Sequence, residues 1–431
     1  MITNNMQPKV AMLPLSEAQE RLLAVIRSRM QLTATTVSIF SALDRTLAAD
    51  VFSPIAVPTA TNSAMDGYAL RFADVMLSTQ QRWQIVGQSL AGHPFEGEIP
   101  TGACIRITTG AVVPADLDTV VMQEDIQLSA ELDTASLVIK RRPIAGQHIR
   151  LCGSELEVGQ LVLQQGTVLG PLQLGLLATL GIAEVSVYQL VRVGVLSSGD
   201  ELKQPGEVLQ DGDLFDSNRI MLLSVLKRFG CDVVDLGWVN DDPQALRSLL
   251  QTAANKVDVI VSSGGVSVGD ADYTRQVLSE LGEMDFWQVA IKPGKPFAFG
   301  WLNRADSECH DQISPVWLFG LPGNPVSAAV TCEQLLIPAL QLLSGQQVQK
   351  PVLWPAKTVQ GLRKKPGRLD MQRVNLQVTV DGIKAESVGT DSSGMLSSMM
   401  HADALTWLEQ QRNDVEPGED IWVQPKSCWW R

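Results

Sequence analysis

The chain has 431 residues, of which 45% are hydrophobic, and a formal net charge of −13. A chain of this length and apolar content is expected to fold into about two to four domains with packed cores. The acidic balance excludes general binding to nucleic acid or to anionic membranes, so an anionic substrate would need a local basic pocket.

The first residues carry neither the basic flank nor the apolar stretch of a secretory signal, and the six Cys form no closely spaced pair. These features favour the cytoplasm. Residues 158–183 carry no charge, but several glutamines, Pro171 and glycines interrupt the apolar pattern. We therefore expect buried soluble structure there rather than a membrane span.

Residues 15–30 are expected to form an amphipathic helix. Ser16 and Gln19 have the spacing of a capping box, and an apolar series that includes Leu22 and Ile26 follows them. This pattern predicts a helix that begins near Ser16 and buries one face.

The next segments suggest one domain inserted into another. Residues 45–142 alternate short apolar runs with Pro, Gly and Asp turns, which predicts a mainly β domain. Residues 143–190 return to Leu-rich helical spacing. We expect them to join residues 1–44 in one discontinuous, elongated domain.

Residues 191–345 alternate apolar runs with helical stretches. The runs VRVGVL, CDVVDLGWV, VDVIVSS and FWQVAI alternate with amphipathic segments, which predicts a doubly wound, mostly parallel sheet covered on both faces. Ligands of such sheets bind beyond the carboxyl ends of the strands. The expected site loops are 197–201, 240–242, 263–272, 292–296 and 321–325.

Residues 346–431 return to β patterns. The run RVNLQVTV precedes Asp381 and Gly382, a hairpin signal, and VEPGEDIWVQP suggests another hairpin. A small C-terminal β-barrel fits this tail. The predicted fold class is therefore α/β plus β in a multidomain chain, with the α/β domain, the inserted β-rich domain, the discontinuous N-terminal domain and the barrel.

Two glycine turns carry the first functional signal. Residues 261–275 and 321–329 each place glycines after an apolar run and before a helical segment, where backbone N–H groups and a helix start can hold an anion. The first turn is not a Walker A loop, because Asp270 and Ala271 stand where Lys and Ser or Thr are required. Tight turn geometry alone is the alternative, and the presence of a second turn favours ligand binding.

The second turn, PGNPVSAA, also has a simpler interpretation. Asn324 suits an N-cap and Pro325 suits the first helical position, so capping chemistry explains both. Gly323 and Ser327 are explained less fully by capping, since a hydroxyl in the first helical turn can also face a bound oxyanion.

Charged residues gather on the predicted ligand edge. Lys292 and Lys295 share one turn with two prolines, and the alternative to an anion site is a solvated surface loop. Carboxylates recur at Glu201, Asp241, Asp242, Asp270 and Asp272, which suits Mg²⁺ beside a phosphate, although Asp242 before Pro243 is better explained as an N-cap. A zinc site is not expected, because the four His are scattered and no CxxC is present.

Seven motifs together resemble the molybdopterin molybdenumtransferase family, which is related to the E domain of gephyrin. They are NSAMDGYA (62–69), RITTGA (106–111), SSGDEL (197–202), DSN (216–218), SSGGVSVGDADYT (262–274), AIKPGKPFAFG (290–300) and GLPGNPVSA (320–328), with a weaker match in GRLDMQR (367–373). The resemblance covers nearly the whole chain in order. Residues 151–155, LCGSE, depart from the basic stretch and Gly-Glu-Asp that usually follow in the family.

The resemblance implies a Mg²⁺-dependent homodimer of four-domain subunits. Its reaction inserts molybdenum from molybdate into adenylylated molybdopterin and releases AMP and molybdenum cofactor. The active-site cleft would lie between subunits, with the β domain that carries Asp66 facing the α/β domain of its partner. A contact with the molybdopterin adenylyltransferase would also suit this role.

The resemblance also implies roles for individual residues. The implied catalytic residues are Asp66, Thr109, Glu201, Asp241, Asp272, Lys292 and Lys295. The implied metal ligands are Asp66, Glu201 and Asp272. The implied binding residues are Gly264, Gly265, Ser267, Pro322, Gly323, Asn324, Pro325, Ser327, Arg368 and Ser393.

Two alternative functions share this fold. A molybdopterin adenylyltransferase would consume ATP, and the flanking β domains argue against it. A catalytically silent scaffold is disfavoured by the intact Asp66, Glu201 and lysines.

Overall fold

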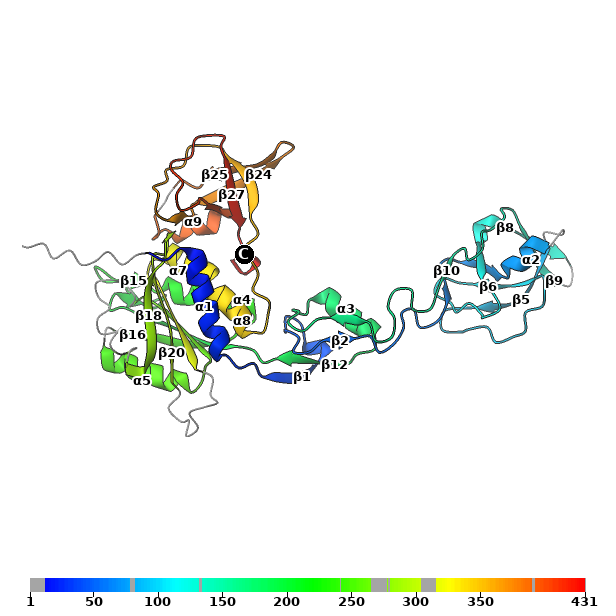
Figure 1. Ribbon diagram of the computed structural model, residues 1–431, viewed down its shortest axis with the longest axis horizontal. Helices are drawn as coiled ribbons and strands as arrows, with labels where there is room; N and C mark the ends of the chain where they lie inside the picture. The colour runs from blue at the N-terminus through cyan, green and yellow to red at the C-terminus, as the bar shows by residue number, and fades with distance from the viewer. Residues whose placement is uncertain are drawn as a thin grey trace, which may run out of the picture.

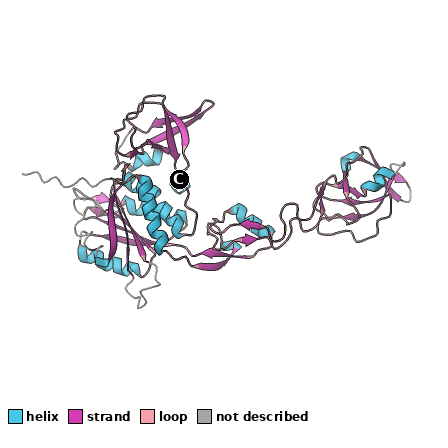
Figure 2. Ribbon diagram, in the orientation of Figure 1, coloured by secondary structure: helices cyan, strands magenta, loops and turns pink. Residues whose placement is uncertain are grey.

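The protein is an elongated chain of domains. The computed structural model describes residues 12–77, 82–131, 134–240, 242–264, 277, 280–303, 315–389 and 392–430. Figure 1 shows the α/β domain and the C-terminal barrel at one end, a small middle domain, and a β-rich domain at the other end. Helices gather in the α/β domain, whereas the other domains consist mainly of strands (Figure 2). The predicted α/β plus β multidomain fold is confirmed.

The α/β domain is built on a six-stranded sheet in the order β16-β13-β17-β21-β20-β18. The strands are β16 (Asp232–Val239), β13 (Arg192–Ser198), β17 (Val259–Ser263), β21 (Val316–Leu321), β20 (Pro296–Leu302) and β18 (Gly282–Gln288). The first four run parallel, as predicted for a mostly parallel sheet.

The strand predicted around FWQVAI does not continue the parallel series. β18 runs antiparallel to β20, and β20 runs antiparallel to β21. The connection from β18 to β20 is too short for the crossover that a parallel neighbour requires, so the chain turns back on itself.

Helices cover both faces of this sheet. They are α1 (Leu15–Arg29), α4 (Ser217–Phe229), α5 (Pro243–Ala254), α7 (Pro325–Thr331), a π-helical segment η3 (Cys332–Leu336) and α8 (Ile337–Leu343). One buried cluster combines residues of α1, α4, α7 and α8 with one face of the sheet, and a second combines α5 with the other face. The predicted helix after residue 272 lies mostly outside the described residues.

The N-terminal helix packs on the α/β domain, which differs from its predicted place in the discontinuous domain. Leu22 and Ile26 are fully buried in the same cluster as sheet residues. The predicted capping box is wrong, since α1 begins at Leu15 after Pro14, and Gln19 Nε2 donates to the Gln334 carbonyl oxygen at 2.7 Å. An amphipathic pattern shows that a face is buried but does not show against what.

The middle domain pairs two distant parts of the chain. β1 (Ala34–Ser38) pairs with β12 (Glu184–Tyr188), and β2 (Val51–Phe52) pairs with β11 (Leu161–Leu163). α3 (Pro171–Thr179) packs on them around a small buried core. The domain combines strands from both parts of the chain, and β2 pairs within it rather than within the β-rich domain.

The β-rich domain holds a six-stranded sheet in the order β7-β4-β6-β5-β9-β8. The strands are β4 (Gly67–Leu70), β5 (Arg82–Ser89), β6 (Ala103–Ile107), β7 (Thr119–Met122), β8 (Ile126–Glu131) and β9 (Thr134–Ile139), with helix α2 (Phe72–Leu77). A short pair, β3 (Asn62–Ser63) and β10 (Ile149–Arg150), closes the end toward the middle domain. Buried clusters lie on both faces of the sheet.

Residues 151–155, which depart from the family pattern, lie beside the incoming chain where the middle and β-rich domains join. The backbone N–H of Gly153 donates to the Pro58 carbonyl oxygen at 3.0 Å, and the Glu155 N–H donates to Val57 at 2.9 Å. The departure therefore falls on the connection between domains rather than in a cavity of this chain.

The C-terminal domain is a closed five-stranded barrel, as predicted. Its strands are β22 (Trp354–Thr358), β25 (Gly382–Ser387), β24 (Arg373–Thr379), β26 (Ala404–Trp407) and β27 (Asp420–Pro425), with helix α9 (Leu396–His401). β24 and β25 form the hairpin expected at Asp381 and Gly382. The hairpin expected within VEPGEDIWVQP is wrong, because Val415 pairs with Leu362 and β27 pairs with β22 and β26.

A single helical stretch among the described residues, Pro325–Leu343, has the length and hydropathy of a membrane span, and 89% of it is buried inside the protein. It is the core helix formed by α7, η3 and α8. Residues 158–183 contribute a strand and a helix of the middle domain instead.

Candidate active site

A cavity of about 830 Å³ opens where the strand ends of the α/β domain meet the barrel. Its described lining residues come from the loops after β13, β17 and β21, from the turn before β20, and from the barrel. They include Glu201, Asn218, Gly264, Lys292, Lys295, Pro322, Gly323, Asn324, Pro325, Ser327, Arg368 and Ser393. Most of the predicted binding residues therefore share one cavity, at the carboxyl ends of parallel strands.

The two glycine turns lie against each other in this cavity. The Gly264 N–H donates to the Leu321 carbonyl oxygen at 3.2 Å. Gly264 has φ +87°, and a Cβ built there would lie 2.6 Å from the Ser198 carbonyl oxygen. Glycine is thus required at Gly264 for a close backbone approach, whereas a Cβ on Gly323 would find its nearest described atom at 3.9 Å.

The second turn supports more than capping. Asn324 occupies the N-cap position of α7 and Pro325 the first helical position, but the Asn324 side chain makes no cap hydrogen bond with a described residue. The Val326 N–H instead donates to the Ser393 carbonyl oxygen at 3.0 Å. Ser393 therefore ties the barrel to the start of α7, and the Asn324 side chain lines the cavity without a capping role.

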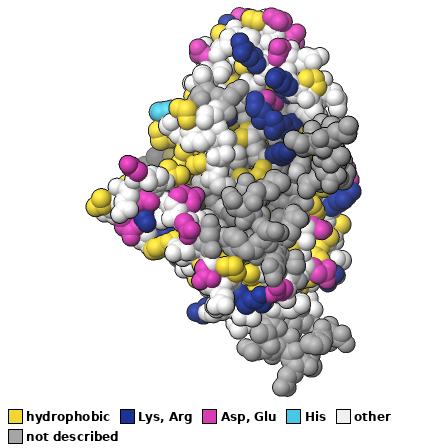
Figure 3. Space-filling model, turned by 90° about the vertical axis from the view of Figure 1, so that its left-hand side faces the viewer, with side chains coloured by type: hydrophobic (Ala, Val, Ile, Leu, Met, Phe, Trp, Pro, Cys, Tyr) yellow, Lys and Arg dark blue, Asp and Glu magenta, His cyan; other side chains and the backbone are white. Residues whose placement is uncertain are grey.

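Three cationic side chains line the cavity: Lys292, Lys295 and Arg368. Lys292 Nζ lies 3.1 Å from Oδ2 of Asp370, a carboxylate whose side chain is 4% exposed. Lys292 and Asp370 are also backbone neighbours, because β19 (Ile291–Lys292) pairs with β23 (Leu369–Asp370). This pairing brings Arg368 beside the lysine turn, and Figure 3 shows Lys and Arg side chains gathered on this end of the molecule.

Lys364 is a fourth cation near this group, and no sequence motif predicted it. It is 3% exposed, and its Nζ donates to the Lys365 carbonyl oxygen at 2.9 Å. Burial lowers the pKa of Lys364, Asp370 opposes that change, and Lys292 and Arg368 add to it. The barrel thus adds positive potential behind the cavity wall.

Glu201 supplies a carboxylate to the cavity beside Gly199. A Cβ on Gly199 would lie 2.5 Å from Glu201 Oε2, so the absence of a side chain leaves room for the carboxylate. Among the described residues, no group of three or more His, Cys, Asp or Glu side chains is placed to hold a metal ion. Asp241, Gly265, Ser267 and Asp272, four predicted site residues, lie outside the described residues.

Asp66 and Thr109 lie together, but far from the cavity of the same chain. The Thr109 N–H and Oγ1 donate to Asp66 Oδ1 at 2.7 and 2.8 Å. These bonds, the backbone one first, hold the pKa of Asp66 below its ordinary value. Figure 1 shows the β-rich domain that carries both residues at the opposite end of the molecule from the α/β domain.

Gly67 belongs to a strand rather than to a turn. It begins strand β4, where a Cβ would lie 2.0 Å from the Val121 carbonyl oxygen. The glycine allows β4 and β7 to approach closely. Asp66, directly before β4, is therefore held at the start of this strand.

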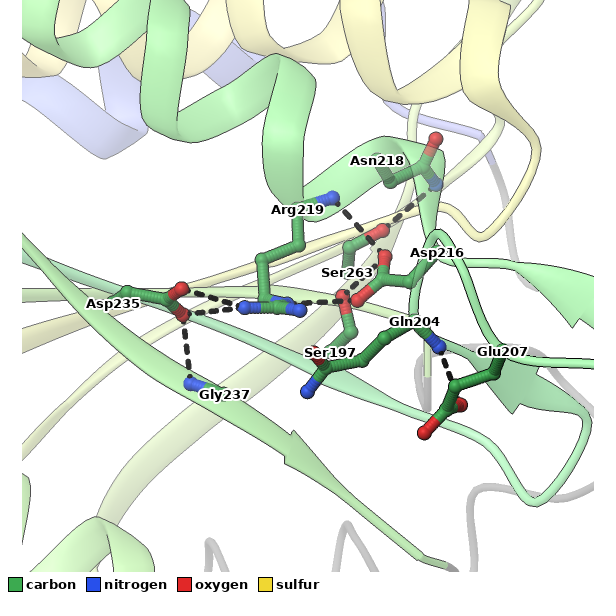
Figure 4. A network of polar contacts seen from close by, with 9 residues as sticks. All are labelled: Ser197, Gln204, Glu207, Asp216, Asn218, Arg219, Asp235, Gly237 and Ser263. Atoms are coloured by element: carbon green, nitrogen blue, oxygen red, sulfur yellow. Dashed lines mark hydrogen bonds and ion pairs between the residues drawn. The ribbon is translucent and has the colours of Figure 1, made fainter.

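A polar network in the cavity wall was missed as a functional feature, although the DSN motif marks it. Figure 4 shows Asp216, Asn218 and Arg219 at the start of α4, linked to Ser197, Ser263 and Asp235. Arg219 Nε donates to Asp216 at 2.8 Å and Arg219 Nη1 to Asp235 at 2.6 Å. Ser197, Ser263 and Asp235 lie 16 to 45 residues from their partners, so the motif alone could not reveal them.

Known proteins resemble this chain over nearly its full length. Family models described as MoeA N-terminal region (domain I and II), probable molybdopterin binding domain and MoeA C-terminal region (domain IV) match residues 13–181, 194–342 and 355–426. The chain is 40% identical to the molybdopterin molybdenumtransferase of Haemophilus influenzae, over 96% of this chain and 98% of that protein. It is 31% identical to gephyrin of Dictyostelium discoideum, over 89% of this chain and 58% of gephyrin.

A solved structure agrees with these relatives. The molybdopterin biosynthesis moeA protein of Pyrococcus horikoshii superposes with a TM-score of 0.79 at 25% identity, covering 96% of this chain and 100% of that one. Fold, cavity and sequence relatives point to the same conclusion. The chain belongs to the molybdopterin molybdenumtransferase family, whose members act in molybdenum cofactor biosynthesis.

Proposed function

We propose that this protein, in the cytoplasm, inserts molybdenum from molybdate into adenylylated molybdopterin and releases AMP and molybdenum cofactor. The observation that carries the proposal is the convergence of Lys292, Lys295 and Arg368 with two glycine turns in one cavity of an acidic protein. Both substrates are anionic, and the cavity offers the local positive charge that the chain as a whole lacks.

The cavity suits two oxyanions held close together. Positive side chains and oriented backbone N–H groups stabilise negative charge as it develops on a phosphate or a molybdate oxygen. Lys292 is fixed by its ion pair with Asp370, so its ammonium group needs little reorganisation when an anion binds. Lys295 and Arg368 face the same space from two different domains.

Asp66 supports the proposal of a homodimer. It is an exposed, ionised carboxylate that accepts a hydrogen bond from Thr109, and its domain lies at the end of the subunit opposite the cavity. We propose that the β-rich domain of one subunit meets the cavity of its partner, so that each active site combines Asp66 and Thr109 with the cavity of the other chain.

Mg²⁺ fits the donors that are present. This ion binds through one or two carboxylates together with substrate phosphates and keeps several waters, so a dedicated protein cage is not required. Glu201 in the cavity, Asp66 from the other subunit, and Asp272 are the proposed ligands. Bound there, the ion would neutralise phosphate charge.

The test is AMP release from purified protein supplied with adenylylated molybdopterin, molybdate and Mg²⁺. Asp66→Asn should lower the rate at least about a hundredfold. The amide oxygen can still accept the hydrogen bonds from Thr109, but the negative charge is lost. Asp116→Asn, which alters an exposed carboxylate of the same domain, should release AMP at the wild-type rate.

Two outcomes would count against the proposal. Unchanged AMP release by Asp66→Asn would remove Asp66 from the mechanism. Consumption of ATP with unmodified molybdopterin would instead identify an adenylyltransferase, and absence of both reactions would favour a silent scaffold.

A further inference from the structure

Asn218, which lines the cavity, connects the two glycine turns. Its Nδ2 donates to Ser263 Oγ at 2.8 Å and to the Gly323 carbonyl oxygen at 2.7 Å. Ser263 ends β17 directly before Gly264, and Gly323 lies in the turn between β21 and α7. A single amide group therefore bridges the backbone of one turn and the strand end that carries the other.

The orientation of the Asn218 amide is determined by its partners. The Gly323 carbonyl oxygen is an acceptor, so the nitrogen of the amide must face it. Asn218 is 7% exposed, and its Oδ1 has no hydrogen-bond partner among the described residues. The amide nitrogen therefore makes both of the hydrogen bonds that join the two turns.

The start of α4 is held in place around Asn218. Asp216 accepts hydrogen bonds from the Arg219 N–H at 3.2 Å and from Ser197 Oγ at 3.1 Å. Arg219, itself 5% exposed, reaches on to Asp235 in β16. Figure 4 shows Asp235, Arg219, Asp216 and Ser197 joined by polar contacts, with the separate contact between Asn218 and Ser263 beside them. These contacts hold the backbone at Asn218 in place, so the position that its amide group can occupy is restricted.

We propose that Asn218 is a positioning residue that sets the separation of the Gly264 and Gly323 turns, and thereby aligns the backbone of both turns on the bound oxyanion. The inference deepens the proposed function and rests on it. A carboxylate at this position would turn an oxygen toward the Gly323 carbonyl, and alanine would leave the turns joined only by the Gly264 N–H bond to the Leu321 carbonyl oxygen. Neither side chain reproduces the bridge.

The test compares Asn218→Ala and Asn218→Asp with wild-type protein. In the AMP-release assay we expect kcat to fall about tenfold to a hundredfold, the size of effect that small misplacement of reacting groups produces. KM should change much less than kcat. Calorimetric titration with pyrophosphate should show weaker binding to both variants, and this measurement does not depend on the proposed reaction.

The control is Gln334→Met, which removes a buried amide far from the cavity lining. Gln334 Nε2 donates to Gln424 Oε1 at 2.8 Å between α/β domain and barrel. This variant should melt at a lower temperature but keep the wild-type kcat. Asn218→Ala should instead show a lowered kcat at a temperature at which the variant is fully folded.

The outcomes separate the inference from the proposed function. Wild-type kcat and pyrophosphate affinity in both Asn218 variants would overturn the positioning role. If kcat falls only in proportion to lost folded protein, the role is structural and the inference is again overturned. If the wild-type protein releases no AMP, the proposed function fails, and pyrophosphate binding alone decides: weaker binding in the variants supports the bridge, and equal binding rejects it.

Discussion

The two regions that carry the predicted site residues differ in construction. The cavity gathers residues from the α/β domain and the barrel, and several are held by buried partners such as Asp370 and the network of Asn218. The distal patch of Asp66 and Thr109 is an exposed pair on a separate domain, whose described contacts are mainly with each other.

This difference suggests that the two regions have separate roles in one site. The cavity is prepared to bind anions without help, since its cations and turns are already in place. The distal patch offers a charged carboxylate but no enclosing pocket, so it becomes useful where another surface supplies the rest of a site. A second copy of the chain would supply that surface, as in the proposed homodimer.

The largest expected effect comes from complementation between the two regions. Asp66→Asn and Lys295→Ala homodimers should each be nearly inactive, because each lacks one half of every site. When the two variants are unfolded, mixed in equal amounts and refolded, about half of the dimers should be hybrids with one intact site, which restores about a quarter of wild-type AMP release.

Two cavity variants provide the control. A mixture of Lys295→Ala and Glu201→Gln should recover no activity, since every hybrid keeps a defect in both cavities. Absence of recovery in the Asp66→Asn mixture would contradict a site shared between chains, and the two regions would then have to act separately.

The next effect concerns the stability of the cavity. Asp370→Asn leaves Lys292 without its buried partner beside Lys364 and Arg368, so the free energy of unfolding should fall by about 2 kcal/mol, reduced by the partial exposure of Lys292. Urea denaturation measures it. Asp420→Asn, which breaks an exposed pair with Lys357, should cost less than about 0.5 kcal/mol. Equal losses would show that the cavity pair is no more important than a surface pair.

A smaller effect separates the two glycine turns. Gly264→Ala should lower stability by about 1–2 kcal/mol, because a side chain there is strained at positive φ and meets the Ser198 carbonyl oxygen. Gly323→Ala should cost less than about 0.5 kcal/mol. Thermal unfolding of both variants tests the contrast. A larger loss of stability in Gly323→Ala would show that the close backbone approach lies at Gly323 rather than at Gly264.

The sequence predicted the cavity well because its features are local. Apolar runs located the parallel strands, glycines marked their ends, and two prolines marked the Lys292 turn, so the rule for parallel sheets brought these loops together. Arg368 and Ser393 were reached through family resemblance. Asn218 and Lys364 were not expected to contribute, because the partners of Asn218 lie 45 and 105 residues away and the burial of Lys364 depends on the tertiary packing of the barrel.

The domain limits were harder to predict for the same reason. The face of α1 is evident in its apolar spacing, but its docking on α8 depends on tertiary contacts. Likewise, β2 resembles its neighbours in composition and differs only in its partner, β11. The strand with which β2 pairs decides the domain to which it belongs, and a single sequence does not show directly which strands pair.

The smallest effect tests how the distal patch keeps its charge. Asp66 has a lowered pKa because the backbone and hydroxyl of Thr109 donate to its carboxylate. Thr109→Val removes the hydroxyl donor and keeps the backbone one, so the pKa of Asp66 should rise toward its ordinary value. In the proposed mechanism AMP release requires the ionised carboxylate of Asp66, so the rate falls as the pH falls through this pKa. The acid limb of the rate profile should therefore move to higher pH in Thr109→Val while the rate at neutral pH stays close to wild type.

An acid limb at the same pH in both proteins would assign that limb to a different group, and Asp66 would then be a contact rather than the carboxylate whose ionisation governs the reaction.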